Sequence, residues 1–363
     1  MKMLKVTDRE WRPIAINNLF SSFVPGKCSS VTHLVKSNRG IEYIGATNRN
    51  NGVLCYLKRN IENTKLIQPG NCIGFIKDGD GSAGYAIYKK EEFVSTVNVI
   101  FGYANWINPL TGLFFTSSQN LIKDKYNHGY KRNLQHLRAD HVMLPFNEQE
   151  QPDFKFMEDF VRERMNILLN KYILYVKKQL INLGEWEQQD YLKYPNVNWK
   201  AFSVQQIFST IQRGKRLKND DHVSGKFPYV SSSAMNNGVA DWVEPIDGCR
   251  VFTPSISLAN SGSVGTAFYE PFNYVASDHI TSFHLEEGSK EIYLFIATSL
   301  EKQKNNFGFN REVNEKRLKK LRVMLPVCSN GQPDYSYMTW YIRGKIIVKY
   351  KKYLQYLNDQ KAI

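Results

Sequence analysis

One glycine-rich segment has the spacing of a nucleotide-binding loop. Gly79, Gly81 and Gly84 fit the pattern G-x-G-x-x-G, which lets backbone N–H groups approach a bound phosphate or dinucleotide. That chemistry requires the loop to lie between a strand and a helix, but an extended Tyr-Ala-Ile-Tyr segment follows it here. A second copy of the segment has Asn260 in place of the first glycine. We therefore predict a β-turn, with no dinucleotide or S-adenosylmethionine site.

Other catalytic patterns are missing from the sequence. Amino-methyltransferases carry Asn/Asp-Pro-Pro-Tyr/Phe, and Asn-Pro-Leu at 108–110 lacks the second proline and the aromatic residue. No GxxxxGK(S/T) loop for ATP occurs. The Pro-Asp pairs at 152–153 and 333–334 suit helix capping better than a nuclease centre. The seven histidines are scattered, without HxxxH or HExxH spacing. We expect no catalytic residue, no bound cofactor and no metal site.

The cysteines and the apolar segments indicate a cellular compartment. Five cysteines lie far apart, and their odd number and the lack of a CxxC pattern argue against a disulfide framework and a zinc site. We expect buried free thiols in a reducing cytoplasm. The charged N-terminus has no apolar run of signal-peptide length, and no stretch approaches the roughly 20 apolar residues of a membrane span. A cytoplasmic protein without a membrane partner is predicted.

The charge balance favours a polyanionic partner. The 363 residues include 48 Lys+Arg and 34 Asp+Glu, which gives a net charge of +14. Soluble proteins this basic often bind nucleic acid and, less often, anionic membranes. The alternative is a basic protein without such a partner.

The elements that must position these residues occur twice. The segment WRPIAINNLFSSFVPGK from Trp11 returns from Trp199 as WKAFSVQQIFSTIQRGK. NNGV, GSAGYAIY, VMLP and QPDFKFM start at 50, 81, 142 and 151, and their counterparts NNGV, GSVGTAFY, VMLP and QPDYSYM start at 236, 262, 323 and 332. The five matches keep one order, and the offset between copies drifts only between 188 and 181. The chain is therefore a tandem duplication of two domains.

Each half has the same predicted plan. A short helical piece opens it, β-rich segments with Gly/Asn/Ser turns follow, and VMLP closes it. After Gln-Pro-Asp the apolar spacing becomes helical, with Asp153 and Asp334 as N-caps. We predict helices over about 154–183, ended by Gly184, and from about 335. Thirty helical residues span roughly 45 Å. We expect the two helices to pair as a spacer; the alternative is that each caps its own domain.

This combination resembles the specificity (S) subunits of type I restriction-modification systems, and more closely those of type IIB-like enzymes. The resemblance covers essentially the whole chain. It rests on the duplication, the NGV and GSxG segments, and the LP…QPD(F/Y)xxM start of each helix. None of these segments is a catalytic signature, so their order and duplication carry the resemblance.

The resemblance implies a mixed α/β (α+β) fold in which long helices separate and follow two β-rich target recognition domains and pair as an antiparallel coiled coil. The expected boundaries are 1–150 and 191–331 for the recognition domains, and 151–190 and 332–363 for the spacer helices. Each domain would read one half of a bipartite site in double-stranded DNA, as part of defence against foreign DNA.

The same resemblance implies the partners. The helices would dock methyltransferase subunits or fused restriction–methyltransferase subunits, and type I complexes also have a restriction subunit. The chain itself would be non-catalytic, while S-adenosylmethionine, Mg and, in ATP-dependent complexes, ATP would serve the partner subunits. Two other functions stay open: a stand-alone tandem-domain DNA-binding regulator, and a stand-alone methyltransferase or nuclease. The missing motifs argue against the second.

Candidate DNA contacts lie in three polar loops and one basic segment of each half. The loops are 45–52, 77–84 and 123–132, matched with 231–238, 258–265 and 302–311. Asn can pair bidentately with adenine and Arg with guanine, and cations attract phosphate. The repeated Asn-Asn-Gly is expected to be a turn, since Asn and Gly tolerate positive φ. Aromatic residues in 123–132 either stack on a base or belong to the core.

The candidate contacts of the first half are Lys27, Thr47, Asn48, Arg49, Lys77, Ser82, Lys125, Tyr126, His128, Tyr130, Lys131 and Arg132. Those of the second half are Arg213, Lys215, Arg216, Ser231, Ser232, Ser233, Asn260, Ser261, Ser263, Lys302, Lys304, Asn305, Asn310 and Arg311.

Overall fold

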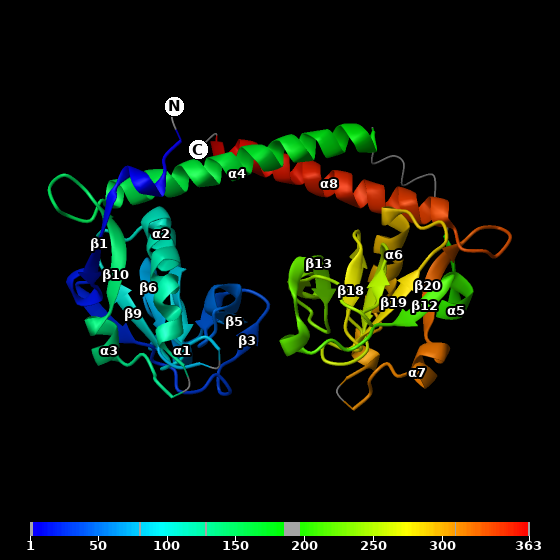
Figure 1. Ribbon diagram of the computed structural model, residues 1–363, viewed down its shortest axis with the longest axis horizontal. Helices are drawn as coiled ribbons and strands as arrows, with labels where there is room; N and C mark the ends of the chain where they lie inside the picture. Colours follow the sequence, from blue (N-terminus) through cyan, green and yellow to red (C-terminus); the bar gives the residue numbers. More distant parts are fainter. Residues whose placement is uncertain (1–2, 80, 128, 185–196, 309, 362–363) are drawn as a thin grey trace. The chain divides into compact units, whose positions relative to one another are not determined.

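Two compact mixed α+β units, Met1–Tyr172 and Ile173–Ile363, make up the chain in the computed structural model (Figure 1). Residues 3–79, 81–127, 129–184, 197–308 and 310–361 are described. Two β-rich domains with accompanying helices confirm the fold class expected from the sequence.

The core of the first unit is built around an antiparallel sheet in the order β2-β9-β6-β7. Its strands are β2 (Ser22–Pro25), β9 (Val99–Tyr103), β6 (Cys72–Ile76) and β7 (Ala86–Lys89). The apolar β6 is buried along its whole length, because both faces of the sheet are covered. On one face Phe75 packs near Phe115 of α2 (Pro109–Gln119), which lies along this sheet in Figure 1. On the other, Phe101 packs with residues of a second sheet.

That second sheet has the order β3-β5-β4-β8. Its strands are β3 (Lys36–Ser37), β5 (Val53–Leu57), β4 (Ile41–Ile44) and β8 (Phe93–Ser95), and β4 and β8 run parallel. A separate antiparallel pair joins β1 (Glu10–Ala15) to β10 (His141–Phe146). The short helical elements are η1 (Val6–Asp8), η2 (Ile16–Asn18), η3 (Arg49–Gly52), α1 (Ile61–Thr64), η4 (Asn120–Lys125) and α3 (Leu134–Ala139).

The second unit repeats this plan. Its sheets have the orders β12-β19-β16-β17 and β14-β13-β18-β15, and β11 pairs with β20. The strands are β11 (Asn198–Ser203), β12 (Thr210–Arg213), β13 (Ser224–Val230), β14 (Val239–Val243), β15 (Val251–Phe252), β16 (Ser255–Ala259), β17 (Ala267–Glu270), β18 (Tyr274–Ala276), β19 (Ile280–His284) and β20 (Arg322–Val327). The helical elements are α5 (Val204–Ile207), η6 (Asn219–Asp221), η7 (Asn236–Gly238), α6 (Lys290–Glu301), η8 (Lys304–Asn306) and α7 (Glu315–Lys320).

The edges of the second sheet distinguish the two units. In the first, β3 extends it at the β5 edge, whereas in the second β15 extends it at the β18 edge, where the described part of the first unit has only the isolated bridge between Gln68 and Phe93. The other strand pairings match, including a register shift between Tyr43 and Ile44 that recurs between Tyr229 and Val230. The duplication predicted from the sequence is therefore a duplication of structure.

Both long helices begin where predicted, and the first also ends where predicted. α4 runs from Phe154 to Leu183 and α8 from Tyr335 to Lys361. The Asp153 carboxylate accepts from the N–H of Phe156, and Asp334 accepts from the N–H of Tyr337, both at 2.8 Å. Gly184, with φ +74°, follows the last residue of α4. The proposed pairing of the two helices stays a prediction.

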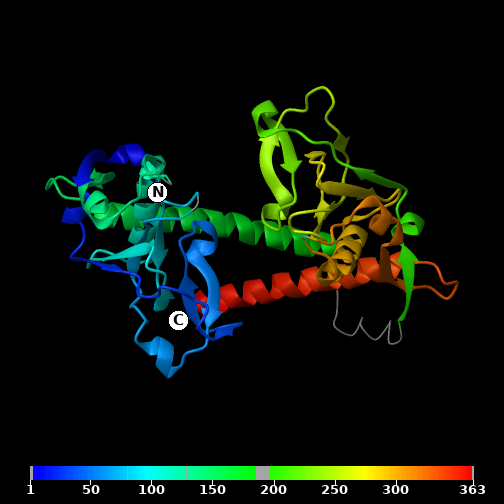
Figure 2. The same ribbon diagram turned by 90° about the horizontal axis from the view of Figure 1, so that it is seen from below.

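Each long helix is anchored on its own unit at its N-terminal end. Met157 of α4 is part of the first unit's core, and the Glu163 carboxylate accepts from the N–H of Leu4 at 2.8 Å. Met338 of α8 is part of the second unit's core, and α8 lies beside α6 in both views (Figure 2). The compact first unit therefore extends past residue 150, through the first part of α4.

Two sequence expectations need correction. The eleven-residue helix α2 and its counterpart α6 fall where only β-rich segments were expected, because both contain several aromatic and β-branched residues, which favour strands by propensity. All five cysteines are free, but only Cys28 and Cys72 are buried, whereas Cys328 is exposed.

Candidate nucleic-acid interface

The three candidate loops of the first unit lie against one another. The N–H of Asn48 donates to Ser82 Oγ at 3.2 Å, which joins loop 45–52 to loop 77–84. The N–H of Arg132 donates to the carbonyl of Lys77 at 3.0 Å, and its guanidinium donates to the carbonyl of Gly84 at 3.1 Å. Segments distant in sequence thus form one loop cluster.

The Asn-Asn-Gly turn of this cluster has the structural role that was predicted. Asn50, Asn51 and Gly52 have φ of 47°, 48° and 80°. The Asn51 amide donates to the carbonyl of Tyr88 at 2.9 Å, and a Cβ on Gly52 would lie 2.6 Å from Cδ1 of Ile87. The turn therefore holds loop 45–52 against β7 and leaves the preceding Asn48 and Arg49 exposed.

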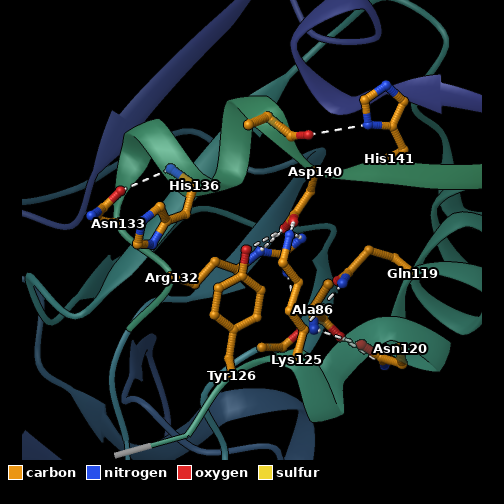
Figure 3. Close-up of polar contacts among 12 residues, drawn as sticks. Ala86, Gln119, Asn120, Lys125, Tyr126, Arg132, Asn133, His136, Asp140 and His141 are labelled. Carbon is orange, nitrogen blue, oxygen red and sulfur yellow. Dashed lines mark hydrogen bonds and ion pairs between the residues drawn. The ribbon is translucent and has the colours of Figure 1, made fainter. Parts of the chain in front are cut away.

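A buried ion pair closes loop 123–132. The Asp140 carboxylate accepts from Arg132 Nε at 3.0 Å, from the Tyr126 hydroxyl at 2.8 Å and from the Lys125 ammonium at 2.7 Å, and Arg132 Nη2 lies 2.9 Å from it (Figure 3). Burial and the Asp140 carboxylate both raise the pKa of Tyr126. Since Arg132 is fully buried, its prediction as a direct contact is corrected to an anchoring role, whereas Tyr126 is mostly buried but lines a surface pocket, and its contact with DNA stays a prediction.

Neighbouring side chains of the same loop are exposed. Tyr130 is 42% exposed and stacks on Tyr126 and on His136, with centroid separations of 5.5 and 4.6 Å. Lys131 forms an ion pair of 2.6 Å with Asp78. Between loops 77–84 and 123–132 lies a pocket of about 660 Å³, whose lining includes Tyr85, Lys123 and Asp124. Loop 123–132 therefore presents an aromatic ring and cations beside a polar hollow.

The loops of the second unit are joined between the same segments, with one backbone link in common and different side chains. The N–H of Val313 donates to the carbonyl of Asn260 at 3.0 Å, as Arg132 does to Lys77. The N–H of Ser263 donates to the carbonyl of Ser232 at 3.1 Å, which joins loops 231–238 and 258–265. The loop cluster is thus a scaffold that both units share.

These links correct one sequence match. Loop 123–132 was matched with 302–311, but the contacts pair Lys123 with Lys304, since Gly84 packs on the former and Gly265 on the latter. Tyr130 then matches Arg311, as the isolated bridges Asn127–Tyr130 and Gly308–Arg311 confirm. The repeated Lys and Arg residues misled the sequence match by two positions.

Three further candidates are buried, which corrects their prediction as direct contacts. Ser82 and Asn260 are each 4% exposed and Ser261 is 8% exposed. Asn260 accepts from the Thr281 hydroxyl at 2.9 Å, and the Ser261 hydroxyl bonds His279. These small polar side chains brace the loops from inside.

The remaining candidates lie at the surface or partly so. The exposed ones are Lys27, Asn48, Arg49, Lys125, Tyr130, Lys131, Arg213, Lys215, Arg216, Lys302, Asn305, Asn310 and Arg311. The half-buried ones are Thr47, Lys77, Ser231, Ser232, Ser233, Ser263 and Lys304. His128 lies outside the described residues. Which of them touch DNA stays a prediction.

The segments that partly match catalytic motifs have structural explanations. Gly79–Gly84 joins strand β6 to strand β7, as the predicted turn requires. Asn108 caps α2, accepting from the N–H groups of Leu110 and Thr111 at 2.8 and 3.0 Å. Among the described residues, no helix is long and apolar enough to cross a membrane, and no group of three or more His, Cys, Asp or Glu could hold a metal ion.

Several polar residues of these surfaces were not singled out from the sequence. Asp140 follows the short α3 as an ordinary acidic residue, with no motif to indicate its buried partners. In the second unit, His222 Nδ1 lies 2.6 Å from Asp241 Oδ2, beside Asp278. Only the folded chain brings these residues together.

Comparison with known proteins places the chain in a family. The profile described as "Type I restriction modification DNA specificity domain" matches residues 8–173 and 196–355, once in each half. A curated relative, the "Type II restriction enzyme BgcI specificity subunit S.BcgI" of Heyndrickxia coagulans, is 25% identical over 233 residues, which cover 63% of this chain and 65% of the relative. The match thus spans slightly less than two thirds of that relative.

Two solved structures are also similar. The S subunit of a type I restriction-modification system from M. genitalium is 15% identical with a TM-score of 0.46, and covers 99% of this chain and 95% of its own. The HsdS subunit from Thermoanaerobacter tengcongensis is 10% identical with a TM-score of 0.30, covering 97% and 91%.

The matching family is a DNA specificity domain and not a catalytic one, as the missing catalytic motifs led us to expect. The profile accounts for both repeats and for most of the chain. The chain therefore belongs to the family of type I restriction-modification DNA specificity domains, and it carries two copies of that domain.

Proposed function

We propose that this chain is the specificity subunit of a restriction-modification enzyme and reads a bipartite site in double-stranded DNA, one half with each unit. The observation that carries the proposal is the loop cluster, in which the backbone link from Arg132 to Lys77 recurs from Val313 to Asn260 while the side chains differ. A shared scaffold with divergent side chains suits two readers of two different half-sites. The net charge of +14 would supply attraction to phosphate that does not depend on sequence.

The long helices would set the gap between the half-sites and dock the methyltransferase subunits. Large apolar side chains of α4 are exposed, with Leu168 at 66%, Leu174 at 68% and Ile181 at 80%, as a docking surface requires. Val176 of α4 and Ile347 of α8 are buried, which suits helices that pack along one face. At about 1.5 Å per residue, the thirty residues of α4 would span roughly 13 base pairs of ~3.4 Å.

The chemistry would belong to the partner subunits. S-adenosylmethionine, Mg and, in ATP-dependent complexes, ATP would be bound by methyltransferase and restriction subunits. This chain would supply only the recognition of the DNA sequence. Such a complex would work in the cytoplasm.

Co-expression of the chain with the methyltransferase of its own system, followed by sequencing of methylated bases, tests this function. We expect two short half-sites separated by a fixed non-specific gap. Exchange of residues 1–150 for the same segment of another family member should then change one half-site and leave the other unchanged. A continuous motif that survives the exchange, or failure to bind a methyltransferase, would instead favour a stand-alone DNA-binding regulator.

A further inference from the structure

The second unit contains a polar pocket of about 500 Å³ next to loop 231–238. Three separate segments contribute to it: the basic segment after β12, the β13–β14 hairpin and the turn before β19. Its charged and polar lining comprises Arg216, His222, Tyr229, Ser231, Asp241, Ser277, Asp278 and His279.

The two acidic residues of this pocket, Asp241 and Asp278, have no acidic counterpart in the first unit. Tyr229 pairs in register with Asp241 as Tyr43 pairs with Cys55. The turn before β19 matches the turn before β9, because Asn260 bonds the carbonyl of His279 as Lys77 bonds that of Asn98. Asp278 therefore stands where the first unit has Val97. The carboxylates are additions to the shared backbone and are not needed to build it.

The two carboxylates are differently engaged. Asp241 accepts from His222 Nδ1 at 2.6 Å and from the N–H of Trp242 at 2.8 Å, so both of its oxygens have partners inside the protein. The carboxylate of Asp278 lies 3.9 Å from His279 Nε2, beyond hydrogen-bond distance, and its side chain is 33% exposed. Asp278 is the acidic side chain of the lining whose carboxylate has no hydrogen-bond partner among the described residues, and the exposed Arg216 lines the same pocket.

The mixed charge decides what the pocket can bind. A phosphate group would meet two carboxylates here, which is unfavourable. The edge of a G·C base pair offers both complements in the major groove, because guanine presents two acceptors and cytosine presents an amino donor. We propose that Arg216 and Asp278 read one G·C base pair in the half-site of the second unit, with Arg216 donating to guanine and Asp278 accepting from cytosine. This inference rests on the proposed function.

The test uses the full chain in complex with its methyltransferase, on a library of DNA duplexes randomised across the methylated motif. Arg216→Gln and Asp278→Val are compared with the wild type, since valine is the residue at the equivalent place of the first unit. Lys218→Gln removes one exposed cation close in sequence that does not line the pocket, and serves as the matched control. Equal unfolding temperatures for all variants would establish that each one folds.

We expect Arg216→Gln and Asp278→Val to reduce discrimination at the same G·C position by about tenfold or more, with the other half-site unchanged. A uniform loss of methylation over all sequences, with a weaker dependence on salt, would show phosphate contacts and overturn the inference. Unchanged discrimination would overturn it too. If the wild-type complex itself yields no split motif, the proposed function fails, and the inference fails with it.

Discussion

The guanidinium of Arg132 lies 2.9 Å from the carboxylate of Asp140, and both side chains are buried in the first unit. At the equivalent places the second unit has Val313 and Leu321, which belong to its apolar core, and Phe307 stands in place of Tyr126. The same backbone arrangement is thus stabilised by a buried ion pair in the first unit and by apolar side chains in the second.

The buried ion pair predicts opposite effects on the stability of the first unit when Asp140 alone is replaced and when its buried partners are replaced with it. Asp140→Leu alone would leave Arg132 as an unpaired buried charge, and we expect it to destabilise the first unit by about 3–5 kcal/mol. The triple variant Tyr126→Phe, Arg132→Val, Asp140→Leu installs the apolar set of the second unit. It should recover most of that loss, because well-packed apolar residues often replace a buried ion pair without cost. Urea unfolding measures both differences.

Lys155→Ala is the control for these variants. It breaks the exposed ion pair of Lys155 with Asp159 on α4, and exposed pairs of this kind contribute about 0.5 kcal/mol or less. A triple variant as unstable as Asp140→Leu would show that the ion pair cannot be exchanged for apolar packing here.

A buried carboxylate makes the stability of the second unit depend on pH. Glu270 is fully buried, and burial raises its pKa from 4.5 to about 7, although Ser257 and Asn237 both donate to it. The folded state therefore retains a proton that the unfolded chain loses above pH 4.5. The free energy of unfolding of the second unit should be highest below about pH 4.5. It should fall by roughly 3 kcal/mol as the pH rises to about 7. Glu270→Gln should remove most of this decline, as measured by urea unfolding at pH 5 and pH 8.

Glu244→Gln provides the matched control, because Glu244 is exposed in the same unit. Its stability should follow the wild-type pH dependence. Equal pH dependence of the wild type and Glu270→Gln would show that Glu270 is ionised in the folded protein throughout this range.

The turn at Asn51 is a further point of stability. Asn51→Ala removes the hydrogen bond to Tyr88 and places alanine at a φ of +48°, so we expect a loss of about 1–3 kcal/mol. Asn51→Gly loses the same bond without the backbone strain, and should cost less. Thermal unfolding of the two variants distinguishes these contributions, and equal losses would mean that the hydrogen bond alone matters.

The sequence predicted the parts of the molecule that follow local rules. The duplication, the ends of α4, its Asp153 cap and the Asn-Asn-Gly turns depend on short-range patterns, and the structure confirms them. Burial of a charged residue depends on partners from elsewhere in the chain. Arg132 looked like a DNA contact because its ion pair with Asp140 and its bond to Gly84 form only on folding. The pocket around Asp278 cannot be predicted from the sequence for the same reason, since three separate segments form it.

We expect some exposed cations of the first unit to contact base edges and others to contact only phosphates. Arg49 lies beside Asn48 at the exposed tip of loop 45–52, whereas Lys27 follows strand β2 as an exposed single cation. We expect Arg49→Ala to relax one position of the first half-site, with a loss of about 1–3 kcal/mol for the preferred base. Lys27→Ala should weaken binding equally for all sequences and reduce the dependence of affinity on salt by about one counterion.

Binding of the complex to matched and mismatched duplexes at two salt concentrations separates the two effects. Should Arg49→Ala weaken all duplexes alike, Arg49 would be a phosphate contact, and base reading in the first unit would fall to Asn48 or Tyr130.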